Sequence, residues 1–504
     1  MGGPKAGKKQ REGSAGWQIL RLRRRAGGRM MQGMKKLLIA MLMAACPLVQ
    51  AWQPVNVNAP EPAREFRAAW VATVFNLDWP SRSGLAASAQ QAELMSIIRQ
   101  AQQLKLNAII LQVRPTADAL YSSGKEPWST WLSGAGVNPG YDPLALAVQE
   151  AHKRGIEVHA WFNPFRANVS GKPVGRGHVS QKLSGHILKA GSTTMLNPSS
   201  SAAQSHVMDV ILDVVRRYDI DGVHLDDYFY PYPPNNNVAD GKTPAQRRAA
   251  IDSFVSTLYR KVKSAKPHVR VGISPFGIWQ PGYPAGVQAG VNAYEHLACD
   301  ARKWLANGWV DYLAPQLYWP CDGPQSFPAL MQWWAAQNPG RPVWPGIATA
   351  RIGGKEFGGR GAGEIANQVN FSRKYARQSS GQLFWSWKSL ASNKGGIQGQ
   401  LQKLYTTVAV PPAMPWSGSA APARPAVQAV DTAQGCSVSW SGASNVRKWV
   451  VQVAHGGQWW TMYVLPGAQT RLVIPANVAR SCDYIAVRPL SGTGVSGTPG
   501  VLKR

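Results

Sequence analysis

The sequence predicts an α/β fold, a (β/α)8 TIM barrel followed by a small C-terminal β-sandwich. From residue 66 onward, apolar strand-like runs alternate with amphipathic helical stretches, and eight such pairs follow one another. The alternative α/β fold is a doubly wound open sheet, which normally carries a glycine-rich phosphate loop after its first strand. Here residues 76–80 (Asn-Leu-Asp-Trp-Pro) follow the first strand instead, which favours the barrel.

The elements of the barrel, residues 64–408, follow from hydrophobic periodicity and helix signals. Apolar residues recur at helical spacing over 90–104. Asp142 and Pro143 are typical of the start of the next helix, and Gly155 lies beyond its end. The expected strands are 66–75, 107–113, 156–162, 221–225, 269–274, 310–317, 342–347 and 382–387, and the later helices are 202–218, 244–264, 294–306, 326–337, 363–377 and 395–406.

Two further regions follow the barrel. Residues 409–426 are rich in Pro, Ala and Ser, which is typical of a linker. Residues 427–504 contain short alternating apolar runs separated by turn residues. This spacing predicts a small β module of fibronectin type III-like form.

Residues 1–51 form an N-terminal extension that we expect to act as a targeting segment. Residues 34–36 (Met-Lys-Lys) and the apolar run 37–45 have the form of a signal peptide, and Val-Gln-Ala at 49–51 permits cleavage there. Processing as a lipoprotein at Cys46 is the alternative. We expect translation to start at Met34, so the basic stretch before it has no structural role.

The chain is strongly basic, with 55 Lys and Arg against 26 Asp and Glu. Residues 1–51 hold eleven of the basic residues and one acidic residue, so the remainder still carries a net charge of +19. Such a charge favours an anionic polymer or surface as the surroundings. No zinc-finger, homeodomain or RNP-type motif accompanies it, so we expect no nucleic-acid partner. After the N-terminal region no apolar run is long enough to span a membrane, so a lipid anchor is the expected membrane contact.

Four cysteines remain beyond Cys46. An even number fits an oxidising compartment. Their positions in the two domains favour the pairs Cys299–Cys321 and Cys436–Cys482, with buried thiols as the alternative. No C-x-x-C motif or Cys/His cluster occurs, so neither a metal nor a cofactor is expected.

The chemistry of such a barrel is expected at the C-terminal ends of its strands. The fourth expected strand runs into Asp226 and Asp227. Alternation turns Val223 and Leu225 toward the helices, so His224 and Asp226 face the interior. Two adjacent acids after an apolar strand are costly unless they are solvated, paired or functional. Capping of the following segment is the alternative role.

Polar and aromatic side chains at the other strand ends are expected to converge on the same rim. Aromatic rings there suit sugar rings, and the chain has 21 Trp. A satisfied core position is the alternative for any single one of these side chains. The expected substrate-binding set is Asp78, Arg114, His159, Trp161, Asn163, Arg166, His224, Tyr228, Tyr230, Gln316, Tyr318, Trp319 and Trp387, and Gln112 also turns inward.

Several motifs occur together in one order. They are Leu77-Asp-Trp-Pro80, Asn138-Pro-Gly-Tyr-Asp-Pro-Leu144, Val158-His-Ala-Trp-Phe-Asn-Pro164, Asp221-Gly-Val-His-Leu-Asp-Asp-Tyr-Phe-Tyr230 and Tyr312-Leu-Ala-Pro-Gln-Leu-Tyr-Trp-Pro320. Over residues 64–407 the chain therefore resembles glycosyl hydrolase-like family 10. The resemblance implies a barrel that hydrolyses peptidoglycan glycan strands, particularly those without stem peptides, in cell-wall remodelling or division. It also implies a periplasmic protein, typically a lipoprotein, with divisome proteins as further partners.

Glycoside hydrolysis generally needs an acid and a nucleophile or base. We expect Asp226 to be the nucleophile or base and Asp227 the acid. The fourth strand is similar to that of α-amylase-like barrels, but the carboxylate these place after the fifth strand is missing, because Ser274-Pro-Phe-Gly stands there. Participation of a substrate N-acetyl group is a variant in which only one of the two acids is indispensable. The other candidates for the acid are Asp78, Asp118, Glu126 and Glu356.

The roles expected for the neighbouring side chains follow from their chemistry. His224, Tyr228 and Gln316 would orient the substrate or tune the acid. Arg114 and Arg166 would meet carboxylates or sugar hydroxyls.

Two other functions remain open. The missing fifth-strand carboxylate is compatible with a non-catalytic glycan-binding barrel that recruits other wall enzymes. A metal-dependent polysaccharide deacetylase would need an Asp and a pair of His ligands, and the nine histidines include no H-x-x-x-H motif.

Overall fold

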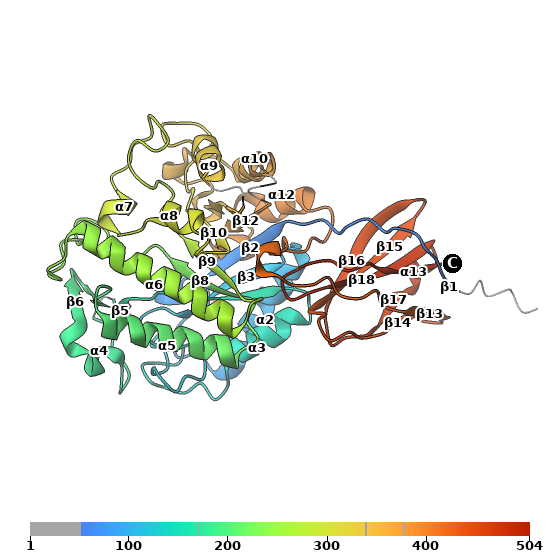
Figure 1. Ribbon diagram of the computed structural model, residues 1–504, viewed down its shortest axis with the longest axis horizontal. Coiled ribbons are helices and arrows are strands. Elements are labelled where there is room, and N and C mark those ends of the chain that lie inside the picture. The colour runs from blue at the N-terminus through green and yellow to red at the C-terminus, as the bar shows by residue number, and fades with distance from the viewer. Residues whose placement is uncertain (1–51, 170, 338–339, 376, 378–379) are drawn as a thin grey trace, which may run out of the picture. The chain divides into compact units, whose positions relative to one another are not determined.

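The computed structural model describes residues 52–504 except 170, 338–339, 376 and 378–379 (Figure 1). The expected signal peptide, both processing positions and Cys46 lie outside these residues. Residues Gln53–Lys503 form one compact unit. In this part of the chain, no helix combines the length and the apolar character that crossing a bilayer requires.

Eight parallel strands form the barrel. Each strand pairs with the next, in the order β10-β9-β8-β4-β3-β2-β12-β11. The two ends of this row meet through the parallel bridges Leu313–Val343 and Gln316–Gly346, so the sheet closes. A closed ring of parallel strands confirms the predicted barrel. Its strands are β2 (Phe66–Val71), β3 (Ala108–Arg114), β4 (Glu157–Phe162), β8 (Gly222–Asp226), β9 (Arg270–Ser274), β10 (Tyr312–Leu313), β11 (Gly346–Ile347) and β12 (Gly381–Phe384).

Helices follow the strands in sequence and surround the ring (Figure 1). The Asp142 carboxylate accepts from the N–H of Ala145 at 3.0 Å, and Pro143 opens the helix, as the sequence predicts. The helices are α2 (Ala87–Gln103), α3 (Pro143–His152), α4 (Val179–Lys182), α5 (Ser201–Arg217), α6 (Pro244–Ala265), α7 (Ala293–His296), α8 (Ala301–Ala306), α9 (Phe327–Ala335), α10 (Ala362–Arg373), α11 (Trp387–Ala391) and α12 (Ile397–Leu404).

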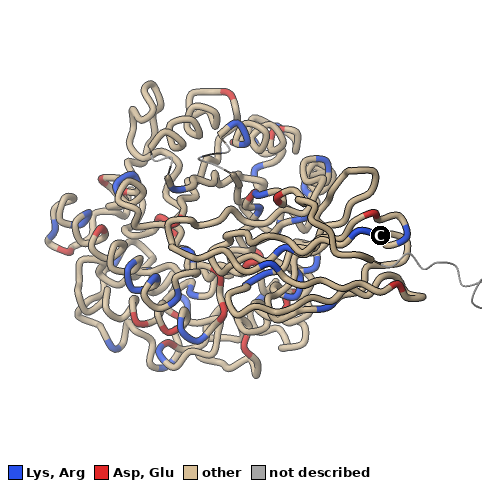
Figure 2. Tube along the Cα trace, turned by 45° about the vertical axis from the view of Figure 1, so that its right-hand side comes forward, with Lys and Arg blue, Asp and Glu red and all other residues tan. Residues whose placement is uncertain are grey.

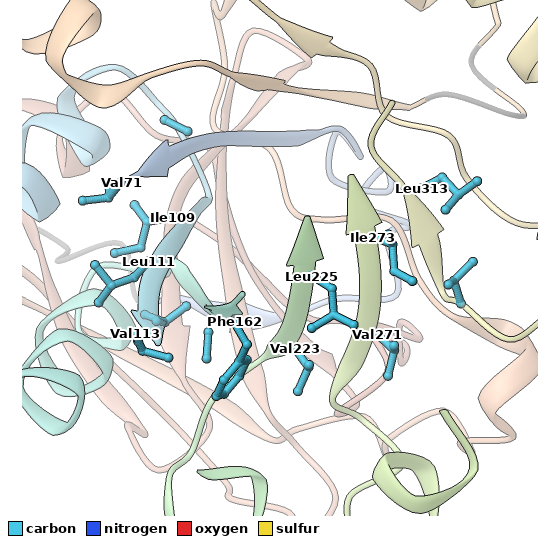
Figure 3. Packing of buried hydrophobic residues seen from close by; sticks show 14 of the residues in the cluster. Val71, Ile109, Leu111, Val113, Phe162, Val223, Leu225, Val271, Ile273 and Leu313 are labelled. Carbon is cyan, nitrogen blue, oxygen red and sulfur yellow. The ribbon is translucent and has the colours of Figure 1, made fainter. Parts of the chain in front are cut away.

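The barrel strands have two buried faces. Val223, Leu225, Val271 and Ile273 point outward and pack in the main core, as Figure 3 shows for β8 and β9. Full burial of each such side chain stabilises the fold by about 1.5–3 kcal/mol. The inward side chains, among them Trp70, belong to a second cluster inside the ring. The alternation predicted for β8 is therefore confirmed.

Four strands are shorter than expected by two residues or more. β10 covers only Tyr312–Leu313 of the expected 310–317, and β11 only Gly346–Ile347 of the expected 342–347. β2 ends at Val71 and gives way to the short turn η1 (Val74–Asn76), and β12 ends before Trp387, which begins α11. Between β4 and α5 the chain adds an antiparallel sheet that periodicity did not predict. It consists of β5 (Arg166–Asn168), β6 (Ile187–Ala190) and β7 (Thr193–Leu196).

The C-terminal module has two antiparallel sheets. One has the order β13-β14-β17 and the other β1-β19-β18-β15-β16. The strand β1 comes from the segment before the barrel, and Figure 1 shows it beside the module. The strands are β1 (Gln53–Pro54), β13 (Val427–Thr432), β14 (Gly435–Trp440), β15 (Lys448–His455), β16 (Gln458–Pro466), β17 (Arg471–Pro475), β18 (Tyr484–Leu490) and β19 (Gly500–Lys503), with the short helix α13 (Ala476–Ala479).

The expected bridge between Cys299 and Cys321 is wrong. Both residues are thiols. Cys299 is buried in the main core, and Cys321, half-buried against the same core, lies beside Glu364 of α10. Cys436 and Cys482 are both buried in the module, and their pairing stays a prediction.

Candidate active site

Asp226 ends β8 and Asp227 follows it at the C-terminal rim of the barrel. Asn163 Nδ2 donates a hydrogen bond to Asp226, and the N–H of Tyr228 donates to Asp226 Oδ1 at 3.3 Å. The Tyr232 hydroxyl donates to Asp227. The two carboxyl groups are neighbours in the chain, yet each has its own set of partners.

Burial raises the pKa of both carboxyl groups, because it disfavours their charged forms. For Asp227, the negative charge of Asp226 adds to burial and the pKa rises to about 7, although Tyr232 and Gln316 donate hydrogen bonds to it. For Asp226, the guanidinium of Arg166 opposes burial. Asp227 therefore retains its proton in a substantial fraction of molecules near neutral pH.

A buried hydrogen-bond chain fixes the orientation of Asn163. Gln112 Nε2 donates to Asn163 Oδ1 at 2.6 Å, and Gln112 Oε1 accepts the N–H groups of Thr73 and Val74, each at 2.8 Å. Because the Oε1 atom of Gln112 faces two backbone N–H donors, its NH2 group must face Asn163. Asn163 must then present its own NH2 group to Asp226. The sequence placed Gln112 on the inner face but gave it no role.

Below the acid pair, a buried hydrogen-bond network fills the interior of the barrel. Trp70 Nε1 donates to His224 Nε2 at 3.1 Å, so Nδ1 of His224 carries the proton and donates to the Tyr312 hydroxyl at 2.9 Å. Burial and the neighbouring His159 hold the pKa of His224 well below its usual value. His159 Nδ1 also lies 2.9 Å from the Tyr312 hydroxyl. Both histidines are fully buried and form the floor of the site.

Arg114 lies within the protein, where it holds two segments together. Its guanidinium forms a fully buried ion pair with Glu126 at 2.6 Å and donates to the carbonyl oxygens of Asn163 and Pro164. Burial opposes ionisation of Glu126, but Arg114 and His206 outweigh it and hold the pKa at about 2. Glu126 is therefore ionised and fully engaged, which does not suit a general acid.

The other carboxylates proposed as the acid have separate positions. Asp78 accepts from the N–H of Ala72, from Ser386 Oγ and from the N–H of Lys388, so it joins the ends of β2 and β12. Asp118 is buried and accepts from the N–H groups of Thr116 and Thr130. Glu356 is exposed on the loop after β11. These three side chains are not among the contacts of Asp226 or Asp227.

The aromatic residues of the predicted set divide into two groups. Trp161 and Tyr318 are close to the pair. The Trp161 side chain lies beside Asp226, and Tyr318 is near enough for the charge of Asp227 to raise its pKa. Trp319 packs edge-on against Phe276, which in turn contacts Tyr232. The structure places two other aromatic residues away from the pair. They are Tyr230, whose hydroxyl bonds Ser199 and Asp240, and Trp387, which is buried in the main core.

Arg166, which begins β5, and Tyr232, in the loop after β8, complete the site. Arg166 Nε donates to the carbonyl oxygen of Pro115 at 2.8 Å, and the guanidinium lies 5.7 Å from the ring centroid of Tyr228. Its charge acts on Asp226. Sequence reasoning missed Tyr232, although its hydroxyl binds Asp227 directly, because it lies beyond the strand and outside the alternation pattern. In the part of the chain that the structure describes, no group of three His, Cys, Asp or Glu side chains could hold a metal ion.

The chain is similar to known proteins. The family model described as glycosyl hydrolase-like 10 matches residues 65–356. Glycosyl hydrolase YngK of Bacillus subtilis (strain 168) is 36% identical over 402 residues, which cover 74% of this chain and 78% of that protein. Glycosyl hydrolase DigH of Escherichia coli (strain K12) is 33% identical over 359 residues, which cover 62% of this chain and 82% of that protein. Among solved structures, an endo-β-1,4-mannanase from Thermotoga petrophila aligns with a TM-score of 0.44 and 11% identity over 88% of this chain and 98% of that one.

Proposed function

Because the chain belongs to the glycosyl hydrolase-like 10 family and is a glycoside hydrolase, we propose that it cleaves the glycan strands of peptidoglycan, in particular strands without stem peptides. The observation that carries the catalytic part is the unequal surroundings of Asp226 and Asp227 on one rim. A glycosidase needs one carboxyl group that is protonated and one that is ionised under the same conditions. The pair supplies both.

In the proposed reaction, Asp227 protonates the glycosidic oxygen and the bond from this oxygen to the anomeric carbon breaks. Asp226 stays ionised, held by Asn163 and the charge of Arg166, and it either attacks the anomeric carbon as nucleophile or takes a proton from the water that attacks this carbon. The water molecule supplies the hydroxyl of the new reducing end. Its other proton goes to Asp227 if Asp226 is the nucleophile, and to Asp226 if Asp226 is the base.

The charge of the chain supports an acidic glycan as the substrate. Figure 2 shows Lys and Arg at many positions of both the barrel and the module, interspersed with fewer Asp and Glu. Removal of stem peptides leaves a free lactyl carboxylate on each muramic acid, so a stripped strand is a polyanion. A basic enzyme would attract it over the distance of the Debye length.

The proposal extends to the location of the enzyme, its partners and the fold of its C-terminal module. The N-terminal segment would direct the chain to the periplasm, either as a soluble protein or as an outer-membrane lipoprotein attached through Cys46, with divisome proteins as partners in cell division. The order of strands in the module, β13-β14-β17 against β19-β18-β15-β16, supports a fibronectin type III-like fold for residues 427–504.

Mass spectrometry of the products tests the proposed activity. Residues 52–504 would be incubated with intact sacculi and with amidase-stripped strands. We expect new reducing ends from stripped strands, and a loss of about 10²–10⁴-fold in kcat for Asp227→Asn. Asp213→Asn is the matched control, because Asp213 pairs with Arg217 on α5. Binding of stripped strands without any product from the wild type would instead identify a glycan-binding barrel.

A further inference from the structure

The rim carries an aromatic surface at the end of β2, apart from the acid pair. Phe75 of η1 exposes 51% of its surface and the neighbouring Leu77 exposes 42%. We call Phe75, together with Trp131 and Lys172 beside it, the β2 ledge. Nothing in the proposed mechanism uses these three side chains.

The backbone of the ledge is strained. Phe75 has a φ of 58° and Asn76 a φ of 52°, in the left-handed region that residues with a Cβ rarely adopt. The Asn76 side chain holds the turn, because its Nδ2 donates to the carbonyl oxygens of Trp131 at 2.7 Å and Pro80 at 3.0 Å. The chain thus maintains an unfavourable conformation that leaves a phenyl ring in water. Such a feature indicates that the ring has a ligand.

The support beneath Phe75 is rigid. Val74, Trp131 and Val169 form a small buried cluster of their own, separate from the main core. The ring of Trp131 meets Phe75 edge-on, with the centroids 5.1 Å apart and the planes at 61°. Phe75 therefore rests against Trp131, and 51% of its surface stays open to a ligand.

A cation stands beside this aromatic surface. The ammonium of Lys172 lies 5.6 Å from the ring centroid of Trp131, and its side chain is exposed. An aromatic face suits the apolar face of a pyranose ring, and an adjacent ammonium suits a carboxylate on that ring. The ledge thus matches a sugar that carries a negative charge.

The ledge also connects to the acid pair. The N–H of Val74, next to Phe75, donates to Gln112 Oε1, and Gln112 holds the Asn163 that binds Asp226. Both features therefore belong to one hydrogen-bonded part of the same rim. A glycan bound at Asp226 could extend toward β2.

We propose that the β2 ledge is a distal glycan subsite, in which a pyranose ring stacks on Phe75 and a carboxylate of that sugar pairs with Lys172. The inference rests on the proposed function, because the charged sugar would be a muramic acid whose lactyl carboxylate is free. A stem peptide converts this carboxylate to a neutral amide and adds bulk. The subsite would thus select stripped strands.

Kinetics with Phe75→Ala, Phe75→Trp and Lys172→Gln test the subsite. On long stripped strands we expect Phe75→Ala to raise KM about tenfold with kcat unchanged, and Phe75→Trp to restore KM. We expect Lys172→Gln to abolish the preference for strands with free lactyl carboxylates over strands whose carboxylates are methyl-amidated. Lys189→Gln and Val430→Ala, two exposed substitutions outside the ledge, are the controls.

The possible outcomes separate this subsite from the proposed activity. An unchanged KM in Phe75→Ala, or an equal loss of kcat on all substrates, would overturn the subsite while the activity stands. If the wild type cleaves no glycan, the proposed activity fails, and binding of stripped strands decides the subsite instead. Weaker binding by Phe75→Ala and Lys172→Gln than by the controls would support it, and equal binding would overturn it.

Discussion

Among single residues, Asp227 shows most directly how burial and a neighbouring charge set a chemical role. Its protonated form is the acid and its pKa is about 7, so kcat/KM should fall about tenfold per pH unit above that value. Tyr232 donates a hydrogen bond to the carboxyl group, which favours the ionised form and lowers the pKa. We therefore expect Tyr232→Phe to raise this pKa and to move the alkaline limb to higher pH.

The pH dependence of kcat/KM for wild type and Tyr232→Phe measures this effect. Tyr228→Phe is the control, because the hydroxyl of Tyr228 is not among the donors to Asp227. An alkaline limb that stays in place, or moves to lower pH, would contradict the role given to Asp227.

Gln112 sets the orientation of the Asn163 amide group, and a substitution at Gln112 tests this role. Gln112→Glu keeps an oxygen for the N–H groups of Thr73 and Val74 but removes the NH2 group that binds Asn163. Asn163 is then free to turn its oxygen toward Asp226, which would repel the ionised form. We expect kcat to fall about 10²-fold with little change in KM, because a shift of about 1 Å at a catalytic group has that effect.

Steady-state kinetics and a melting curve check the prediction for Gln112. The control is Thr73→Val, which removes the hydroxyl that donates to the carbonyl oxygen and to Oε1 of Gln112, and leaves both backbone donors in place. If Gln112→Glu and Thr73→Val behave alike, the orientation of Asn163 does not depend on Gln112.

Sequence reasoning reached some site residues and missed others for a physical reason. Alternation along β8 assigned His224 and Asp226 to the inner face, and the structure has them there. Alternation gives the face of a side chain but not the groups it meets. Hence Arg114 was expected at the substrate and lies in a buried ion pair, whereas Tyr232 was missed because its position depends on the path of a loop.

At the scale of elements, the N-terminal ends of β4 and β8 are joined to the module by buried ion pairs. Lys448 of β15 donates to Glu157 at 2.8 Å, and Arg447 pairs with Asp221 at 3.0 Å. Burial opposes ionisation of Glu157, but Lys448, His159 and Arg270 outweigh it and hold the pKa at about 2. These contacts attach β15 to the end of the barrel opposite the acid pair.

We expect Lys448→Met to destabilise the protein by about 3 kcal/mol at pH 7, because it leaves a buried carboxylate without its nearest cation. The folded pKa of Glu157 lies below its unfolded value, so its ionised form stabilises the fold above about pH 4.5. This contribution is lost as the pH falls toward 2. The penalty of the substitution should therefore shrink at pH 3.

Urea unfolding at pH 7 and pH 3 measures the penalty. The double variant Lys448→Met with Glu157→Gln should regain most of the lost stability at pH 7. Lys153→Met removes an exposed pair with Glu150 and should have little effect. A penalty that is equal at both pH values would exclude the charge of Glu157 as its cause.

The elements themselves were predictable to different degrees. The eight strand–helix units repeat a strong pattern, and their number and order were predicted. The sheet β5-β6-β7 has short strands of three or four residues, and β1 has two, so neither could produce a readable period. Pairing of β1 with β19 joins residues that are far apart in the chain, which local patterns cannot reveal.

Across the whole molecule, three further connections join the barrel and the module besides the ion pairs of Lys448 and Arg447. β1 precedes the barrel and pairs with β19, while Arg488 of the module donates to Glu61 at 2.7 Å. The segment 409–426, expected as a linker, contacts both the module and the barrel. Within it Val410 and Met414 are buried, and Trp416 Nε1 donates to Asp311 at 2.8 Å.

Truncation of the module should consequently destabilise the barrel. A fragment of residues 53–408 would keep the buried carboxylates of Glu157, Asp221 and Asp311 but lose Lys448, Arg447 and Trp416. Within the barrel Glu157 keeps Arg270, Asp221 keeps His152 and Asp311 keeps Lys263, but each carboxylate loses a second partner. Loss of a partner by a buried charge is destabilising. We expect the fragment to melt well below the intact chain, and Glu157→Gln within the fragment to recover part of the difference.

The effect of truncation on catalysis follows from the direction of the strands. The module binds where β8 begins, near Asp221, whereas the acid pair lies where β8 ends, at Asp226. Loss of the module should therefore reduce the folded fraction while kcat per folded molecule stays the same. Active-site titration of the fragment below its melting temperature checks this expectation. A lower kcat in the folded fragment would mean that the module also shapes the opposite rim, and the two ends of the barrel would then be coupled through its strands.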